Sequence, residues 1–381
     1  MRHRFLGLAF TPSFQISNLC SSSSEDARSV CYVHDTDVIC MELDCEMNVP
    51  RVLSQSKVDI CGKCQVHQAA YINIGKMVCL GIASDSGFQL WSSTGDRMIW
   101  FISIEAIISA NMLSGMQTDL QFQYVRGIAS IPVFQSVNEH NDVQEAHVCV
   151  GSSLGGVCVY SSKGVLQQCL ALKAALGDAG AGSITSLSGS DAYLVAADEF
   201  GNISAFSVSE NYRKVMQAQT QCVSYGDGGN YCTVVCCKDS MAFAGFLNGL
   251  LRVYNLAAGS LVMEVAAHSR CITGLSLHPS DNYLVSCGED QAVNVWTLPS
   301  PSNGSYRSNL DLAHSEHWVD SVCTGVTWWR SSYVLCVGYD SNNMLVASHR
   351  TRSSMRPDEF RSMKEVSQLL HKASTQASDM K

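Results

Sequence analysis

The sequence predicts an all-β protein in which one antiparallel unit repeats along the chain, and three observations support this. The 381 residues are 46% hydrophobic but only 15% charged, with 7 prolines. A charged fraction this low suits a sheet-rich protein better than one built from long helices. Short alternating segments bounded by turn residues recur, and their ends are almost evenly spaced. Because repeated units share one continuous core, the length does not imply several domains.

The clearest unit runs from His268 to Trp296 and contains three alternating strands separated by two turns. Its strand–turn–strand ending recurs in six other places, the first of which is weak. The seven copies end at Met41, Trp91, Tyr160, Phe206, Tyr254, Trp296 and Val346. Successive ends are therefore 50, 69, 46, 48, 42 and 50 residues apart. Four strands repeated roughly every 40–45 residues are typical of a β-propeller blade. We expect a seven-bladed propeller, with six blades as the alternative, over residues 1–349.

The long second interval predicts an insertion within the repeat. It contains the polar, mildly acidic stretch from Gln135 to His147. Polar segments between strands usually form loops on the surface. We therefore expect a long surface loop near residues 131–147.

Each unit places similar residues at two positions before its end. Six residues before the end, where Asp and Asn tolerate tight turns, stand Asp35, Asp85, Leu154, Phe200, Asn248, Asp290 and Asp340. Four residues earlier, mostly small side chains leave room for the aromatic residue of the neighbouring strand. They are Cys31, Gly81, Val150, Ala196, Ala244, Ser286 and Cys336.

These residues resemble the WD-repeat β-propeller family over roughly residues 30–349. In that family a His, a strand Ser or Thr, a turn Asp and a strand Trp form a buried hydrogen-bonded network. The resemblance implies that His268, Ser286, Asp290 and Trp296 form this structural tetrad. Only their unit has the complete set, and the unit with Asp85 and Trp91 comes next.

The resemblance implies a non-catalytic scaffold or adaptor that binds other proteins, in signalling or vesicle-trafficking complexes. Two alternatives remain open at this point: a membrane-peripheral adaptor docked through a basic C-terminal tail, and a propeller hydrolase. The partner and the face that binds it are not written in the sequence. A homo-oligomer is open as well.

The net charge and the cysteines indicate which kinds of partner and which cellular location to expect. The net charge of -9 repels phosphate, so we expect no nucleic-acid binding. No apolar run reaches the 18 residues of a membrane span, which leaves only peripheral membrane association. The 18 cysteines are irregularly spaced, and many lie in apolar runs. They suit buried, reduced thiols, so we expect a cytoplasmic location, with vesicle association open.

Three motifs could indicate chemistry, and each has a simpler interpretation. Residues 151–155 match the GxSxG pattern of hydrolases, but a strand rather than a helix follows, which favours a hairpin turn. Cys61, Cys64 and His67 are weak zinc-ligand candidates because no fourth ligand follows at a regular spacing. His268, Ser286 and Asp290 could form a catalytic triad, but Trp296 favours the structural tetrad. We expect no catalytic residue, metal or cofactor.

Residues 350–381 differ in composition from the rest. They contain seven basic and four acidic residues, a net +3, whereas residues 1–349 contain 18 basic and 30 acidic residues, a net -12. A Pro-Asp-Glu start at Pro357 and the apolar residues Phe360, Met363, Val366 and Leu370 predict a short amphipathic helix. We expect the final residues to be disordered.

Overall fold

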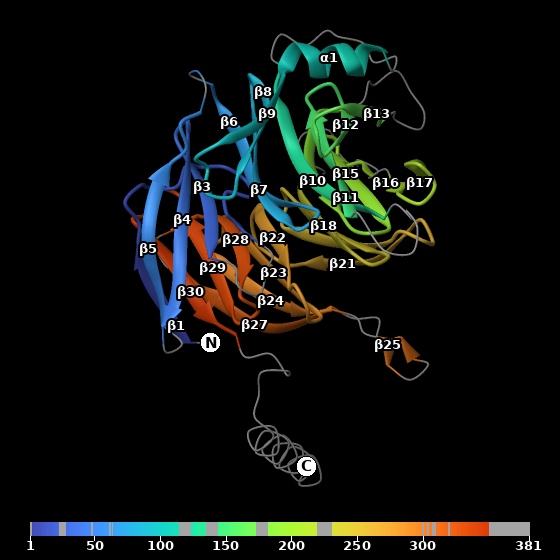
Figure 1. Cartoon of the computed structure of the whole chain (residues 1–381). Coiled ribbons are helices and arrows are strands. Elements are labelled where there is room, and N and C mark those ends of the chain that lie inside the picture. Colours follow the sequence, from blue (N-terminus) through green and yellow to red (C-terminus); the bar gives the residue numbers. More distant parts are fainter. Residues whose placement is uncertain are drawn as a thin grey trace, which may run out of the picture.

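Seven four-stranded antiparallel sheets form the blades of one ring, which confirms a seven-bladed propeller (Figure 1). The computed structural model describes residues 2–22, 28–46, 49–60, 62, 64–113, 123–134, 144–172, 182–218, 231–298, 301–302, 305–306, 310–318 and 321–349. The C-terminal segment 350–381, for which we predict an amphipathic helix and a disordered end, lies outside the described residues.

We number the blades in chain order. Blade 1 contains β2 (Cys20–Ser21), β3 (Ser29–His34), β4 (Asp37–Glu46) and β5 (Val49–Lys57). Blade 2 contains β6 (Val66–Ile74), β7 (Met77–Ser84), β8 (Gly87–Ser92) and β9 (Met98–Ser103). Blade 3 contains β10 (Val125–Phe134), β11 (Gln144–Ser152), β12 (Gly156–Ser161) and β13 (Leu166–Ala171). Blade 4 contains β14 (Ile184–Gly189), β15 (Tyr193–Asp198), β16 (Ile203–Ser207) and β17 (Arg213–Ala218).

Blade 5 contains β18 (Cys232–Lys238), β19 (Met241–Phe246), β20 (Leu250–Asn255) and β21 (Ser260–Ala266). Blade 6 contains β22 (Ile272–Leu277), β23 (Tyr283–Gly288), β24 (Ala292–Thr297) and β27 (Asp311–His317). Between β24 and β27 the chain forms a separate two-stranded hairpin of β25 (Pro301–Ser302) and β26 (Ser305–Tyr306). Blade 7 contains β28 (Cys323–Trp329), β29 (Tyr333–Gly338), β30 (Asn343–Ser348) and the N-terminal strand β1 (Arg2–Gly7).

The first strand of each blade lies toward the middle of the ring, where it contacts the first strands of the neighbouring blades. The second and third strands are covered on both faces by adjacent blades, so they are buried almost without interruption, as in β8 and β16. The outer strands instead alternate between exposed and partly buried residues, as β21 and β27 do. The hydrophobic core is therefore a series of clusters between adjacent blades.

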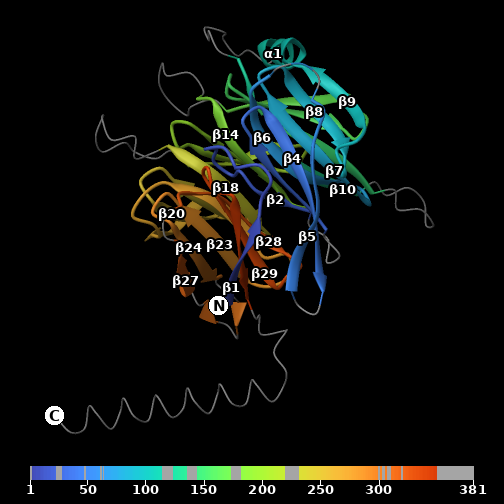
Figure 2. The ribbon, with the colours of Figure 1, turned by 90° about the vertical axis from the view of Figure 1, so that its left-hand side faces the viewer.

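The ring closes because β1 pairs antiparallel with β30, from Arg2 opposite Ser348 to Gly7 opposite Asn343. Figures 1 and 2 both show β1, in blue, beside the red strands of blade 7. The first described strand of the chain thus supplies the outer strand of the last blade, and we had no prediction for this closure.

All blades have the same strand order, so their second-to-third-strand turns lie on one face of the ring, which we call the turn face. All seven turn residues predicted from the repeat lie in these turns, as Asp35 and Asp340 do at φ 51° and 52°. The connections between successive blades reach the same face. The first-to-second-strand turns lie on the opposite face.

The predicted small-residue position needs a correction of one residue in blades 1, 2 and 7, where Tyr32, Ile82 and Val337 take the places expected for Cys31, Gly81 and Cys336. Blade 2 is the example. Ile82, not Gly81, lies opposite Gln89, which is two residues before Trp91. In blade 6 the corresponding pair is Ser286 opposite Asn294, as the repeat spacing predicted. The difference arises because the turn of blade 2 is shorter: Ser84 pairs directly with Gly87.

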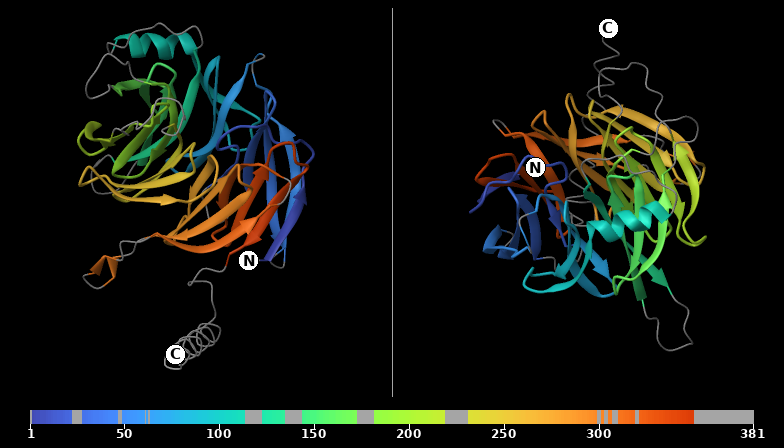
Figure 3. Two further views of the ribbon diagram at one scale, coloured as in Figure 1. Left: turned by 180° about the vertical axis from the view of Figure 1, so that it is seen from behind. Right: turned by 90° about the horizontal axis from the view of Figure 1, so that it is seen from above.

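The insertion in the second interval also differs from the prediction. Residues 131–134 and 144–147 are not loop but the paired ends of β10 and β11, because Ile131 and Ala146 are buried and hold the strands together. We did not predict α1 (Ile104–Leu113), the helix between β9 and β10. Figures 1 and 3 show this helix at the rim of the ring, far from the N-terminus.

Candidate functional site

The predicted tetrad residues come from four segments of blade 6 that the structure brings together. His268 lies before β22, Ser286 on β23, Asp290 in the following turn and Trp296 on β24. Trp296 Nε1 lies 2.9 Å from Ser286 Oγ, which lies 2.8 Å from His268 Nε2. His268 Nδ1 lies 2.8 Å from Asp290 Oδ1. Because an indole N–H only donates and a carboxylate only accepts, Trp296 donates to Ser286, Ser286 donates to His268, and His268 donates to Asp290.

Asp290 also fixes the backbone at the turn face. Its Oδ2 accepts the N–H of Ser269 at 2.9 Å, and its Oδ1 accepts the N–H of Ala292 at 3.2 Å. Burial alone would raise the pKa of Asp290, but the hydrogen bond and charge of His268 and these backbone donors lower it to about 2. The carboxylate is therefore ionised at neutral pH and acts as a fixed acceptor.

Neither hydrolase motif has the geometry of an active site. Ser286 has the hydrogen-bond partners of a triad serine, but it is fully buried and its oxygen already accepts the Trp296 N–H. A substrate could not reach it. The GxSxG stretch forms the turn between β11 and β12, and Ser153 Oγ accepts the N–H of Tyr124. No helix follows to supply an oxyanion hole.

Other blades close with different side chains, which the repeat alignment did not reveal. In blade 2, Trp91 Nε1 donates to Gln89 Oε1 at 3.0 Å. In blade 4, buried Asp198 accepts the N–H groups of Phe200 and Asn202 at 3.0 and 2.8 Å. In blade 1, Asn18 exchanges hydrogen bonds with the backbone of Val33. Each of these substitutes is a buried Asn, Gln or Asp whose polar atoms are paired, as buried polar groups generally are.

The structure does not assemble a zinc site from the part of Cys61, Cys64 and His67 that it describes. Cys64 is buried, and the His67 ring packs against Tyr124 with 4.8 Å between ring centroids. Burial and the charge of Arg126 lower the pKa of His67. Cys61 lies outside the described residues. Among the described side chains, no three His, Cys, Asp or Glu residues are grouped so that they could hold a metal ion.

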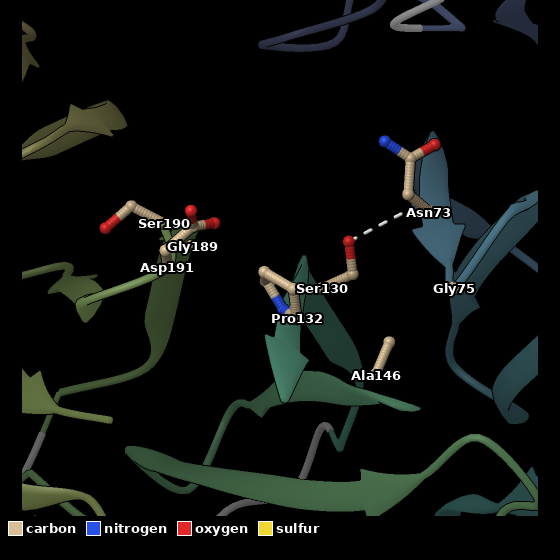
Figure 4. A pocket seen from close by; sticks show the side chains of 8 residues that line it. All are labelled: Asn73, Gly75, Ser130, Pro132, Ala146, Gly189, Ser190 and Asp191. Atoms are coloured by element: carbon tan, nitrogen blue, oxygen red, sulfur yellow. Dashed lines mark hydrogen bonds between the residues drawn. The ribbon is translucent and has the colours of Figure 1, made fainter. Parts of the chain in front are cut away.

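A pocket of about 340 Å³ opens on the face opposite the turn face, between blades 2, 3 and 4 (Figure 4). Its lining residues are small or polar: Asn73, Gly75, Ser130, Pro132, Ala146, Gly189, Ser190 and Asp191. Ser130 Oγ accepts the backbone N–H of Asn73 at 3.3 Å. Asp191 is the one titratable side chain in this lining, so the pocket lacks the acid–base pair that catalysis would use.

The turn face combines exposed apolar side chains with acids. Phe14, Phe200, Leu247 and Tyr339 are exposed there by 54%, 52%, 38% and 52%, and the Phe14 and Tyr339 rings lie 5.7 Å apart. The second-to-third-strand turns also present five acids beside the engaged Asp290. These acids are Asp35, Asp85, Glu199, Glu289 and Asp340. None of the seven turns, all of which the structure describes, contains Lys or Arg.

Several bases temper this acidity without cancelling it. Lys57, at the end of β5, pairs with Asp37 beside the turn of blade 1 at 2.6 Å. Arg126 and Arg270 lie near the starts of β10 and β22, on the same side of the ring. The acids remain in excess, and the Asp35 side chain is 83% exposed. A mixed apolar and acidic surface of this kind is suited to binding rather than to chemistry.

Comparison with known proteins places this chain. The family model WDR54 matches residues 58–349. The chain belongs to the WDR54 family. It is 27% identical to WD repeat-containing protein 54 of Mus musculus over 278 residues, which covers 70% of this chain and 74% of the mouse protein. It is 26% identical to WD repeat-containing protein 54 of Homo sapiens over 277 residues, which covers 69% and 72%.

Part of the chain also matches a yeast protein, U3 small nucleolar RNA-associated protein 21 of Saccharomyces cerevisiae. The two are 27% identical over 117 residues, which cover 31% of this chain and 11% of the yeast protein. Among solved structures, a chain of the "Crystal Structure of Mitotic Checkpoint Complex" superimposes with a TM-score of 0.63. At 13% identity, covering 91% of this chain and 93% of that one, it shows the fold alone. WDR54 family members are WD-repeat propellers, a class that typically forms non-enzymatic scaffolds for protein–protein interaction.

Proposed function

We propose that this chain is a non-catalytic adaptor whose turn face binds a basic segment of another protein. One observation carries the proposal: exposed Phe14, Phe200 and Tyr339 share a face with five turn acids, and the turns contain no base. Aromatic side chains on the surface are good anchors because they bury a large area with little loss of conformational entropy. Surrounding acids steer a basic partner and disfavour acidic ones.

The partner expected from this surface is a segment rich in Lys or Arg with aromatic or aliphatic anchors of its own. Rim charges act mainly on the rate of association and its salt dependence, whereas the buried anchors hold the complex together. The proposal therefore predicts two separable effects, one for the apolar residues and one for the acids.

A peptide array tests the apolar part. The double variant Phe14→Ser, Tyr339→Ser should lose binding to basic, aromatic-containing peptides. The control is Leu261→Ser, Val262→Ser on β21, where both side chains are similarly exposed, at 50% and 47%, on the outer side of blade 5. The control should bind like the unmodified chain. Equal binding by all three proteins would contradict the proposal.

The rate of association tests the role of the acidic residues. Asp35→Asn, Asp85→Asn and Asp340→Asn combined should slow association with a bound basic peptide and flatten its dependence on salt. Asp239→Asn, an exposed acid in a turn of the opposite face, is the matched control. A salt dependence unchanged by the triple variant would place the basic segment elsewhere.

Our proposal extends to location and setting: a cytoplasmic adaptor in signalling or vesicle-trafficking complexes. It is supported by the 16 described cysteines, all free thiols and most of them buried. In the described part of the chain no helix is long and apolar enough to cross a membrane. Fluorescence microscopy of the full chain and of a chain ending at residue 349 distinguishes the alternatives. Vesicle association that depends on residues 350–381 would favour the membrane-peripheral adaptor.

A further inference from the structure

Two cysteines face each other across neighbouring strands of blade 3. Cys158 on β12 and Cys169 on β13 are directly paired, and their Sγ atoms lie 3.5 Å apart. Directly opposite residues in an antiparallel pair have Cα atoms about 4.5–5.5 Å apart, within the range of about 4.4–6.8 Å that a disulfide spans. The backbone is therefore already placed for a bond between these two sulfurs.

The two thiols differ in access. Cys158 is fully buried, whereas Cys169 is only partly buried and lies on the outer strand of the blade. The hydrogen bond with Cys169 and then burial raise the pKa of Cys158 well above its usual value. A small oxidant therefore meets Cys169 first, and Cys158 remains as the partner that can resolve the product.

The same pair is tied to α1 through Asn111, which is fully buried. The Cys169 thiol donates to Asn111 Oδ1 at 3.2 Å. Asn111 Nδ2 donates to the backbone carbonyl of Ile107 at 2.8 Å and to Cys158 Sγ at 3.7 Å. Asn111 thus connects the helix to both sulfurs, so a chemical change at the sulfurs alters the hydrogen bonds of α1.

We propose that Cys158 and Cys169 are a modification site that forms a reversible disulfide with a peroxide as the oxidant. The Cys169 thiol loses its proton, its thiolate attacks hydrogen peroxide, and the O–O bond breaks to give a Cys169 sulfenic acid and hydroxide, which takes up the thiol proton and leaves as water. Cys158 sulfur then attacks the Cys169 sulfur, the S–O bond breaks, and hydroxide leaves with the Cys158 proton as a second water. Two thiols and one peroxide give one disulfide and two waters. An excess of a small thiol reduces the disulfide by thiol–disulfide exchange and restores both cysteine thiols.

The disulfide has a consequence for α1. It contains no S–H, so Asn111 Oδ1 loses the donor that Cys169 provides. Losing one hydrogen bond to a buried oxygen is destabilising. The half of α1 that contains Asn111 therefore opens more often when the disulfide is present, and amide hydrogen exchange measures that opening.

Mass spectrometry on the purified full chain tests the site. The protein is treated with graded hydrogen peroxide, blocked with an alkylating reagent under denaturing conditions, and digested. We expect a linked peptide that joins Cys158 to Cys169, the loss of these two alkylation sites, and recovery of both with dithiothreitol. Hydrogen exchange in residues 104–113 should rise with the linked fraction and return on reduction.

Two variants control the experiment. Cys169→Ser keeps a donor for Asn111 and should abolish both the linked peptide and the rise in exchange. Cys149→Ser is the matched control, because Cys149 is a buried cysteine of the same blade whose opposite residues are Ala129 and Val159. It should behave like the unmodified chain. A peroxide dose that oxidises Cys169 without linking it to Cys158 would overturn the site, and linkage without a change in exchange would overturn its connection to α1.

Discussion

Trp296 both fills part of the core of blade 6 and donates a hydrogen bond there. The side chain is only 4% exposed, and its N–H begins the hydrogen-bond chain that ends at Asp290. Removing the indole would leave a cavity and would also take the donor from Ser286. Cavities and orphaned buried polar groups both destabilise a fold, and here one substitution produces both.

We predict that Trp296→Ala lowers the free energy of unfolding by about 3–5 kcal/mol. Asp35→Ala, at an exposed turn of blade 1, should cost much less because its side chain closes no comparable network. Chemical denaturation of both purified variants measures the difference. An unchanged transition midpoint for Trp296→Ala would contradict the structural role of the tetrad.

Gly288 tests how tightly the network is packed. A Cβ added there would lie 2.8 Å from the Cys271 carbonyl oxygen and 2.9 Å from His268 Nδ1. Gly288→Ala should therefore destabilise the protein by roughly 1–3 kcal/mol, through overpacking beside the His268–Asp290 hydrogen bond. Gly7→Ala, whose Cβ would meet nothing within 4 Å, is the control and should have a near-normal melting temperature. Similar melting temperatures for the two variants would refute this explanation.

The tetrad was predictable because four residue types stand at fixed places in one unit. Gln89, Asp198 and Asn18 were not, because their partners are set by the register of a turn or by a neighbouring segment. A shift of one residue in a turn changes which side chain faces Trp91, and the sequence shows no such shift. Hydrogen-bond partners that depend on strand register therefore could not be predicted from the sequence.

At the scale of elements, the six-residue strand β1 closes the ring. It covers the edge of β30, which would otherwise present unpaired backbone groups. Exposed strand edges pair with other chains, so the loss of β1 promotes both opening and association.

Deleting residues 2–7 should lower the melting temperature and produce soluble aggregates in size-exclusion chromatography. Deleting residues 301–306, which contain only the separate β25–β26 hairpin, should change neither property. If both deletions behave alike, β1 does not stabilise the ring.

The strands were predictable from alternation and spacing, but α1 was not. Its sequence is mostly apolar and follows the apolar strand β9, so it resembles a continued strand. The missed signal is Ser103, whose side chain accepts the N–H of Ala106 at 3.4 Å and begins the helix. A helix-starting serine followed by an acidic residue, here Glu105, is a recognisable start.

At the scale of the whole molecule, several partly buried histidines make stability depend on pH. Burial, followed by the charges of His278 and His314, lowers the pKa of His349 to about 4. Burial also lowers the pKa of His278 and of His147. His278 and His349 both pack on Trp328, with ring centroids 4.6 and 5.3 Å away.

A lowered histidine pKa means that the unfolded chain binds the proton more readily than the folded one. Stability should therefore be complete above about pH 6.5 and fall as the pH drops toward 4. Thermal melting across this range measures the fall. His349→Phe, which keeps a ring against Trp328, should flatten it, whereas His317→Gln at an exposed position should not. An unchanged slope in His349→Phe would assign the dependence to other groups.

The number of blades was predictable from the spacing of the repeat ends, because each blade is mostly a local structure. Ring closure was not, because β1 pairs with a strand almost the whole chain away. The acidic, aromatic turn face was also missed. Phe14, Phe200 and Tyr339 stand far apart in sequence. The common orientation of the blades brings the turns of Phe200 and Tyr339, and the β1–β2 connection that contains Phe14, to one side.

The pairing of β1 with β30 also sets the order in which the protein can be completed during translation. Six blades can form from strands that are close in the chain, as each leaves the ribosome. Blade 7 must wait, because Arg2 is made long before its partner Ser348. Long-range pairing of this kind is slow and leaves edges open in the meantime. A nascent chain that stalls before β30 therefore holds β1 without a partner and is a natural client for chaperones.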